Sequence, residues 1–215
     1  MVYDDRYKRI FNSDLLEGAK RDGKYGFSTI HVTHARPQRL ISFDKALSCK
    51  DHDQWVHGYI PDPLLQRLWH NPWRYLDLFQ RYEGAISPDF SVPIHLPPYV
   101  QLGSVANSRA IGSWLQRCGV DVIPNVRWGL RDTYEFAFDG IEPGGTIAVG
   151  TLGCMKDPEL RRIFSDGIPE LLRRISPEAI VVYGTIRDDV FDLAYESGVE
   201  ILPFDSRTAL VWKEA

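Results

Sequence analysis

Short apolar runs recur along the chain, separated by longer stretches in which apolar residues return every three or four positions. The runs predict strands at residues 39–43, 84–87, 120–126, 146–150, 179–183 and 199–203, with 208–212 as a further candidate. Runs such as Ile180-Val181-Val182-Tyr183 are apolar at consecutive positions rather than at every second one. A strand that is covered on both faces needs this pattern, so it indicates a parallel sheet.

Helix start signals, in the form of Asp-Pro, Asn-Pro or Pro-Pro pairs, precede most of the helical segments. The segments predict one broken helix or two short ones over 62–82, a long helix over 99–118, a helix from 157 to 175 interrupted at 167–169, and a helix over 188–197. Asp132 and Glu135 have the spacing of a capping box and predict a short helix. A strand is the alternative there, because Tyr134, Phe136 and Phe138 alternate.

The alternation of about six strands with helices predicts an α/β fold of mainly parallel strands. An incomplete or distorted (β/α) barrel is favoured over an open doubly wound sheet. With 215 residues, the chain is short for a complete eight-unit barrel of about 250 residues. No strand leads into a GxGxxG sequence, which weakens a dinucleotide-binding interpretation. Residues 40–215 are expected to form a single domain. Residues 1–39 are expected to form an N-terminal arm or cap that packs on it, with a short edge strand at 28–33.

Composition narrows the class of protein. A hydrophobic content of 44% with 25% charged residues is typical of a globular domain, and a net charge of −4 argues against a generic polyanion binder. The three cysteines are widely spaced, which suits a reducing compartment better than a disulfide framework. No apolar run approaches the roughly 18 residues of a membrane helix, and the polar N-terminus lacks the apolar region of a signal peptide. These features predict a cytoplasmic protein without membrane contact; oligomeric state is left open.

The carboxyl ends of parallel strands are where α/β proteins hold their ligands. The side chains expected at these ends are Asp44, Ser87, Asp89, Asn125, Arg127, Trp128, Thr151, Tyr183, Thr185 and Asp205. The carboxylates Asp44, Asp89 and Asp205 are the candidates for catalysis, since such groups divide acid and base roles or share a divalent metal. The competing interpretation is that these aspartates cap turns after strands.

Several further residues are candidates for ligand contact. Asn107 and Arg109 lie on the helix over 99–118, where Arg109 could clamp a phosphate or carboxylate or could be an ordinary surface arginine. Trp128 and Glu135 flank the loop after the third strand, where Trp128 would stack on a ring or cover the core. Thr151 lies in a glycine-containing turn that would hold a phosphate through backbone N–H groups or serve only as a tight turn.

Metal and nucleophile patterns are weak. Cys49, His52 and His57 have zinc-ligand chemistry, but a fourth ligand and a standard spacing are missing, so no metal site is predicted. Cys154 could act as a nucleophile. Its base would have to come from the N-terminal half, because all six histidines precede position 96.

An ordered series of short motifs runs through most of the chain. It comprises Ser87-Pro88-Asp89-Phe90-Ser91, Arg109-x4-Trp114-x-Gln116, Ile123-Pro124-Asn125-Val126-x-Trp128-Gly129, Glu135-Phe136-x-Phe138-Asp139-Gly140-Ile141, Val149-Gly150-Thr151-x-Gly153-Cys154 and Val182-Tyr183-Gly184. The series resembles the family known as domain of unknown function 4417, found in bacteria, phages and other mobile elements. The resemblance covers roughly residues 40–205, implies a phage or plasmid setting, and brings no established activity or catalytic residues.

Two functional hypotheses follow. In the first, a small phosphorylated or nucleotide-like ligand binds at the strand ends and is turned over there if the protein is an enzyme. Asp89, Asn125, Arg109 and Thr151 would orient the ligand between Trp128 and Tyr183. In the second, the protein is a non-enzymatic phage or plasmid accessory protein. It would bind a host factor or a nucleic acid through the N-terminal arm with Arg36 and Arg39.

Overall fold

The computed structural model describes residues 11–206, and the candidate strand at 208–212 lies outside this range. Seven parallel strands follow one another in chain order. The first sheet contains β3 (Leu40–Ser42), β4 (Trp55–His57), β5 (Gly84–Ile86) and β6 (Val122–Ile123), and the second contains β7 (Thr146–Gly150), β8 (Ala179–Tyr183) and β9 (Glu200–Phe204). A parallel bridge between Asn125 and Ala148 joins the two sheets. The α/β class with mainly parallel strands is therefore confirmed.

The buried strands are the ones that the apolar pattern placed best. β7 and β8 have the predicted bounds, and all their residues are buried. β4 was not predicted, because its three residues lie within a polar stretch, yet Trp55, Val56 and His57 are all buried between β3 and β5. A three-residue strand is too short to show a period of its own, so tertiary contacts decide it.

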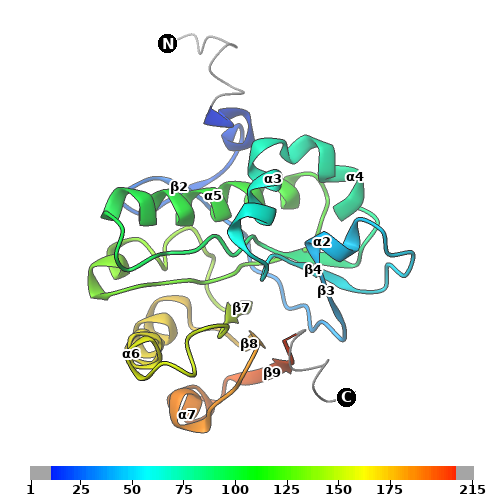
Figure 1. Ribbon diagram of the computed structural model, residues 1–215. Helices are drawn as coiled ribbons and strands as arrows, with labels where there is room; N and C mark the ends of the chain where they lie inside the picture. The colour runs from blue at the N-terminus through cyan, green and yellow to red at the C-terminus, as the bar shows by residue number, and fades with distance from the viewer. Residues whose placement is uncertain (1–10, 207–215) are drawn as a thin grey trace.

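The helices pack on both sides of the strands (Figure 1). They are α2 (Phe43–Ala46), α3 (Asp62–His70), α4 (Leu76–Phe79), α5 (Pro98–Arg117), α6 (Pro158–Ile175) and α7 (Asp188–Glu196), with 3-10 turns η1 (Ser13–Leu16), η2 (Pro72–Tyr75) and η3 (Arg131–Glu135). The predicted interruption of the helix at 167–169 is wrong, since α6 is continuous through Pro169. The predicted capping box is also absent: η3 starts after Leu130 without a side-chain cap.

Side chains alternate between two faces of the strands, as the pleat requires. Trp55, Ile86, Ile123, Ala148 and Val181 share one apolar cluster, to which strands of both sheets contribute. Residues at the intervening positions pack outward, into one cluster with α3–α5 and another with α6 and α7. A common inner face is the arrangement of a (β/α) barrel. Among the described residues, however, β9 is not paired with β3, so barrel closure stays a prediction.

Residues 11–39 lie along the strands rather than apart from them. β1 (Arg21–Asp22) and β2 (Phe27–Ser28) form an antiparallel hairpin, and Ile30 bridges Ile141. Leu15 is fully buried in the cluster that contains α5. The edge strand expected at 28–33 is thus replaced by β2 and a single bridge. Within residues 11–206, no helix combines the length and apolar character needed to cross a bilayer.

Candidate functional site

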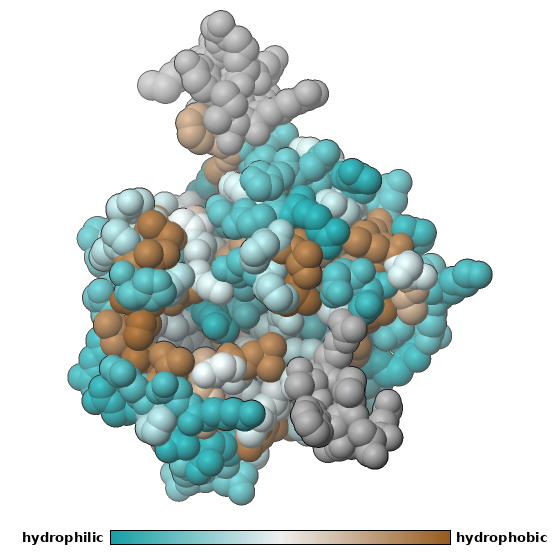
Figure 2. Space-filling view, viewed as in Figure 1, coloured by the Kyte–Doolittle hydropathy of each residue, from teal (hydrophilic) through white to brown (hydrophobic). Residues whose placement is uncertain are grey.

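A pocket of about 500 Å³ opens beside the carboxyl ends of β5, β6 and β7. Its walls come from the loops that follow these strands and from the first turns of α6. They comprise Asp62, Ser91–His95, Val126–Trp128, Gly150, Leu152–Cys154, Leu160, Ile163 and Phe164. The space-filling view shows a hollow on this face with hydrophobic side chains along its border (Figure 2). The pocket therefore lies at the edge where α/β proteins place their sites.

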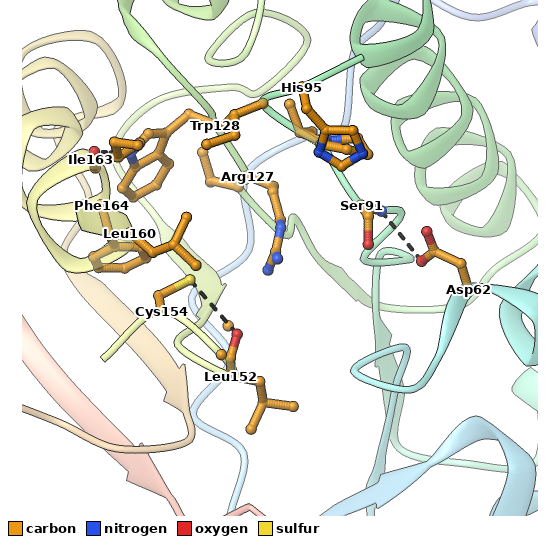
Figure 3. A pocket seen from close by; sticks show the side chains of 16 residues that line it. Asp62, Ser91, His95, Arg127, Trp128, Leu152, Cys154, Leu160, Ile163 and Phe164 are labelled. Carbon is orange, nitrogen blue, oxygen red and sulfur yellow. Dashed lines mark hydrogen bonds between the residues drawn. The ribbon is translucent and has the colours of Figure 1, made fainter. Parts of the chain in front are cut away.

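The Arg127 side chain projects between the two walls of this pocket (Figure 3). Its Nη1 lies 3.2 Å from Oδ2 of Asp89, and the two side chains are 25% and 11% exposed. The negative charge of Asp89 raises the pKa of Arg127 above its ordinary value, so the guanidinium stays charged. Among residues 11–206, Asp89 is the one hydrogen-bond partner of this guanidinium, so its other N–H groups are available to a ligand.

A chain of buried hydrogen bonds fixes Asp89. Asn125 donates from Nδ2 to Asp89 Oδ1 at 2.8 Å and accepts at Oδ1 from the Tyr59 hydroxyl at 2.9 Å. The Asn125 backbone N–H donates to Ser87 Oγ at 2.8 Å. Burial raises the pKa of the Asp89 carboxyl, while the Arg127 charge and the Asn125 hydrogen bond act in the opposite direction. The network holds the carboxylate that in turn orients Arg127.

The wall of the pocket formed by Trp128 and the start of α6 is aromatic. Trp128 stacks on Phe164, with ring centroids 4.7 Å apart and an angle of 29° between the ring planes. The indole N–H donates to the Ile163 carbonyl at 3.3 Å, which satisfies the one polar group of a nearly buried ring. The ring therefore packs on α6, as a tryptophan that covers the core does, and it also lines the pocket; stacking on a ligand stays a prediction.

Three more polar groups line the pocket. Asp62, at the start of α3, accepts from the Ser91 backbone N–H at 3.3 Å, and His95 lies on the same side (Figure 3). Cys154 lies across from them. Burial raises the pKa of its thiol, so the neutral form, a poor nucleophile, prevails at neutral pH. The arrangement suits binding of an anion beside an apolar group.

Six of the residues expected at the strand ends fall into two groups. Ser87, Asp89 and Asn125 come together in the network behind Arg127, and Trp128 lines the pocket. Thr151 and Tyr183 instead lie inward: Thr151 Oγ1 is 3.4 Å from the Tyr183 carbonyl, which accepts its hydrogen bond. The Tyr183 ring stacks on Tyr59 at 4.9 Å.

Four other candidates lie away from the pocket lining. Asp44 is in the first turn of α2, and Asp205 is exposed after β9. Asn107 is half-buried on α5, and exposed Glu135 pairs with Lys24 of the arm. Within the described part of the chain, no three His, Cys, Asp or Glu side chains are grouped so as to hold a metal ion.

Arg109 is buried and bonds to backbone carbonyls instead of facing the pocket. It is 1% exposed, and its guanidinium donates to the carbonyls of Asp139, Asn125 and Ala137 at 2.8–2.9 Å. Burial lowers the pKa of this arginine to about 10. The side chain thereby ties α5 to the end of β6 and to the loop before β7.

The pocket residues that the sequence did not place at the site are Asp62 and His95. Arg127 was expected at a strand end between Asn125 and Trp128, but without a role of its own, and Cys154 was weighed as a nucleophile. Asp62 was interpreted as a helix cap, and nothing in the sequence pointed to His95, which reaches the pocket from an irregular loop.

The two arginines proposed for nucleic-acid binding by the arm have internal partners. Arg36 Nε lies 2.6 Å from Glu200 Oε2, and Arg39 Nη1 lies 2.6 Å from Asp51 Oδ2. Paired guanidinium groups present less positive charge to a polyanion, so these contacts do not favour the arm as a binding surface.

Fold and pocket together define a parallel α/β protein with a cationic, aromatic-walled pocket at its strand ends. The model of the family described as Domain of unknown function (DUF4417) matches residues 19–205, so the chain belongs to this family. The match includes part of the arm, which corrects the expectation that all of residues 1–39 fall outside the shared pattern.

Two curated phage proteins are similar to the chain. The Gene 1 protein of Mycobacterium phage L5 is 34% identical over 132 residues, 61% of this chain and 58% of that protein. The Gene 1 protein of Mycobacterium phage D29 is 33% identical over 132 residues, 61% of this chain and 49% of that protein. The chain thus spans about half the length of these relatives, and the matches bear out the phage association.

Proposed function

We propose that the pocket binds a small ligand with an anionic group and an aromatic or apolar part, of the phosphorylated or nucleotide-like class. The observation that carries this proposal is Arg127, whose charged guanidinium projects into a largely apolar pocket with most of its donors unused. A guanidinium matches a phosphate or carboxylate through two parallel hydrogen bonds. The Trp128 and Phe164 rings would cover the rest of the ligand. Turnover would draw on Asp62 and His95 for proton transfer.

The first test is a thermal-shift and calorimetric screen of nucleoside monophosphates, nucleoside diphosphates and sugar phosphates. Arg127→Gln is expected to weaken a ligand that stabilises the wild type roughly 10- to 100-fold, since a hydrogen bond to a charged group contributes about 1.5–3 kcal/mol. The matched control is Arg162→Gln, an exposed arginine on α6. It is expected to keep the wild-type affinity.

Removing Arg127 alone leaves Asp89 buried without its counter-charge, which destabilises the fold. The double variant Asp89→Asn, Arg127→Gln keeps a neutral pair of similar size. It should fold and still fail to bind. The proposal is overturned if the wild type responds to no member of the screen, or if the double variant binds as the wild type does.

A further inference from the structure

A second cluster of charge lies on the outer surface of α3, η2 and α4. There a cavity of about 430 Å³ is lined by Arg67, Arg74 and Arg81, together with Leu47, Tyr75, Asp77 and Leu78. It shares no lining residue with the strand-end pocket. Three arginines against a single carboxylate make this a local basic patch on a chain whose net charge is −4.

The three arginines of this cluster differ from six others in the described part of the chain. Ion pairs to carboxylates engage Arg36, Arg39, Arg127, Arg173, Arg174 and Arg187. Arg67, Arg74 and Arg81 form no such pair with a carboxylate among residues 11–206. Their positive charge is therefore not neutralised within the described part of the chain.

Local contacts hold two of the guanidinium groups in place. Arg67 donates from Nε to the Leu64 carbonyl at 3.0 Å and lies over the Phe43 ring at 5.7 Å. Arg81 donates from Nε to the Asp77 carbonyl at 3.1 Å. These bonds engage Nε and leave both Nη groups, the pair that grips a phosphate, without a partner among the described residues.

We propose that the Arg67–Arg74–Arg81 cluster contacts the phosphate backbone of a nucleic acid. The Tyr75 ring and the Leu78 side chain, which also line the cavity, are buried, so the cavity offers charge but no exposed aromatic face to hold a base. Recognition then rests on phosphates and is independent of sequence. The three charges lie on α3, on η2 and just after α4, and this spacing fits a series of phosphates along a strand better than one small anion.

The test is fluorescence anisotropy with a labelled single-stranded oligonucleotide over a series of NaCl concentrations. Each neutralised phosphate contributes about −0.7 to the slope of log K against log salt on single strands, so three arginines predict a slope of about −2. Replacing one arginine by glutamine should reduce the slope by about 0.7, and the triple glutamine variant should abolish saturable binding.

The variant Arg74→Glu tests the charge of the cluster without disturbing the fold, because Arg74 is exposed and makes no hydrogen bond with another described residue. It is expected to weaken binding at least fivefold at unchanged melting temperature. Arg162→Gln is expected to bind as the wild type does, which separates this cluster from a general effect of surface charge.

Two results overturn the proposal. One is the absence of saturable oligonucleotide binding by the wild type at low salt, or binding whose slope the triple variant retains. The other is stabilisation of the wild type, but not the triple variant, by inorganic pyrophosphate without any oligonucleotide binding, which would assign the cluster to a small anion.

Discussion

At the scale of single residues, burial strongly perturbs the titration of His57. Its ring is 3% exposed, lies 4.3 Å from the Tyr183 ring, and accepts at Nδ1 from the Tyr59 backbone N–H at 3.1 Å. Burial lowers the pKa of His57 to about 3, against an ordinary value of about 6.5. The folded state therefore keeps the ring neutral where the unfolded chain would take up a proton.

The stability that depends on a neutral His57 is fully present above pH 6.5 and is lost as the pH falls toward 3. Its contribution to the slope of unfolding free energy reaches about 1.4 kcal/mol per pH unit. We expect His57→Gln to flatten the stability profile between pH 6.5 and 4.5 by roughly this slope, as measured by urea unfolding at each pH. His70→Gln, at an exposed histidine, should keep the wild-type slope. Parallel profiles for wild type and His57→Gln would contradict this assignment.

Two arginines show what residue-level prediction can and cannot reach. Arg109 and Arg127 both follow plausible patterns for a ligand clamp. In the structure, Arg109 donates to three backbone carbonyls, whereas the Arg127 side chain projects into the pocket. Residue type and spacing are the same kind of signal in both cases. The difference is which side chain faces the core, and only tertiary packing determines that.

At the scale of elements, α6 shows a glycine with a packing role. Gly167 is expected from its propensity to weaken a helix, and the sequence there predicted a break. The helix instead continues, because the Trp128 ring occupies the space where a Cβ would lie: an added Cβ at Gly167 would be 2.1 Å from Trp128 Nε1. The glycine lets the helix approach the aromatic wall of the pocket.

Gly167→Ala should therefore destabilise the protein, although alanine favours helices. We expect a loss of about 1–3 kcal/mol in the free energy of unfolding by urea, as for other overpacked cores. The matched control is Gly103→Ala in α5, where a Cβ would meet nothing within 4 Å. It should stabilise by about 0.5–1 kcal/mol. Equal effects at the two glycines would show that Trp128 does not depend on this close approach.

At the scale of the whole molecule, the arm contributes to the core. Leu15 is 0% exposed, and Ile30 is 0% exposed beside α5. The backbone of Thr33 accepts from the Thr146 N–H at 2.7 Å, where β7 begins. An isolated fragment of residues 40–215 would expose the apolar surfaces that these side chains cover, so we expect it to lack the cooperative unfolding of the full chain.

A point substitution tests the contribution of the arm to the core without removing the arm. Leu15→Ala should lower the free energy of unfolding by about 2–5 kcal/mol, the range for fully buried leucines. Val32→Ala, at a 39% exposed arm residue, should change it by less than about 1 kcal/mol. Chemical unfolding of both variants measures the difference. If the two substitutions cost the same, or if residues 40–215 unfold as cooperatively as the full chain, the arm is only an appendage.

The α/β class was predictable because fully buried strands such as β7 and β8 must be apolar at consecutive positions. The three-residue β4 was not, and neither was the uninterrupted course of α6. For the site, the sequence indicated the correct edge of the sheet but not which loops enclose a cavity there. His95 lies in a loop without regular structure, and its place in the pocket lining depends on how that loop folds.

The order of the strands also has a consequence in time. Strands β3 to β9 lie side by side in the order in which a ribosome makes them, so each can pair with one already synthesised. The arm is the exception, because its partners lie far along the chain. Arg36 pairs with Glu200, and the Thr33 carbonyl accepts a hydrogen bond from Thr146. Such long-range contacts form late. The arm precedes the strands in the chain and is thus made before them, yet it is among the last segments to reach its native partners.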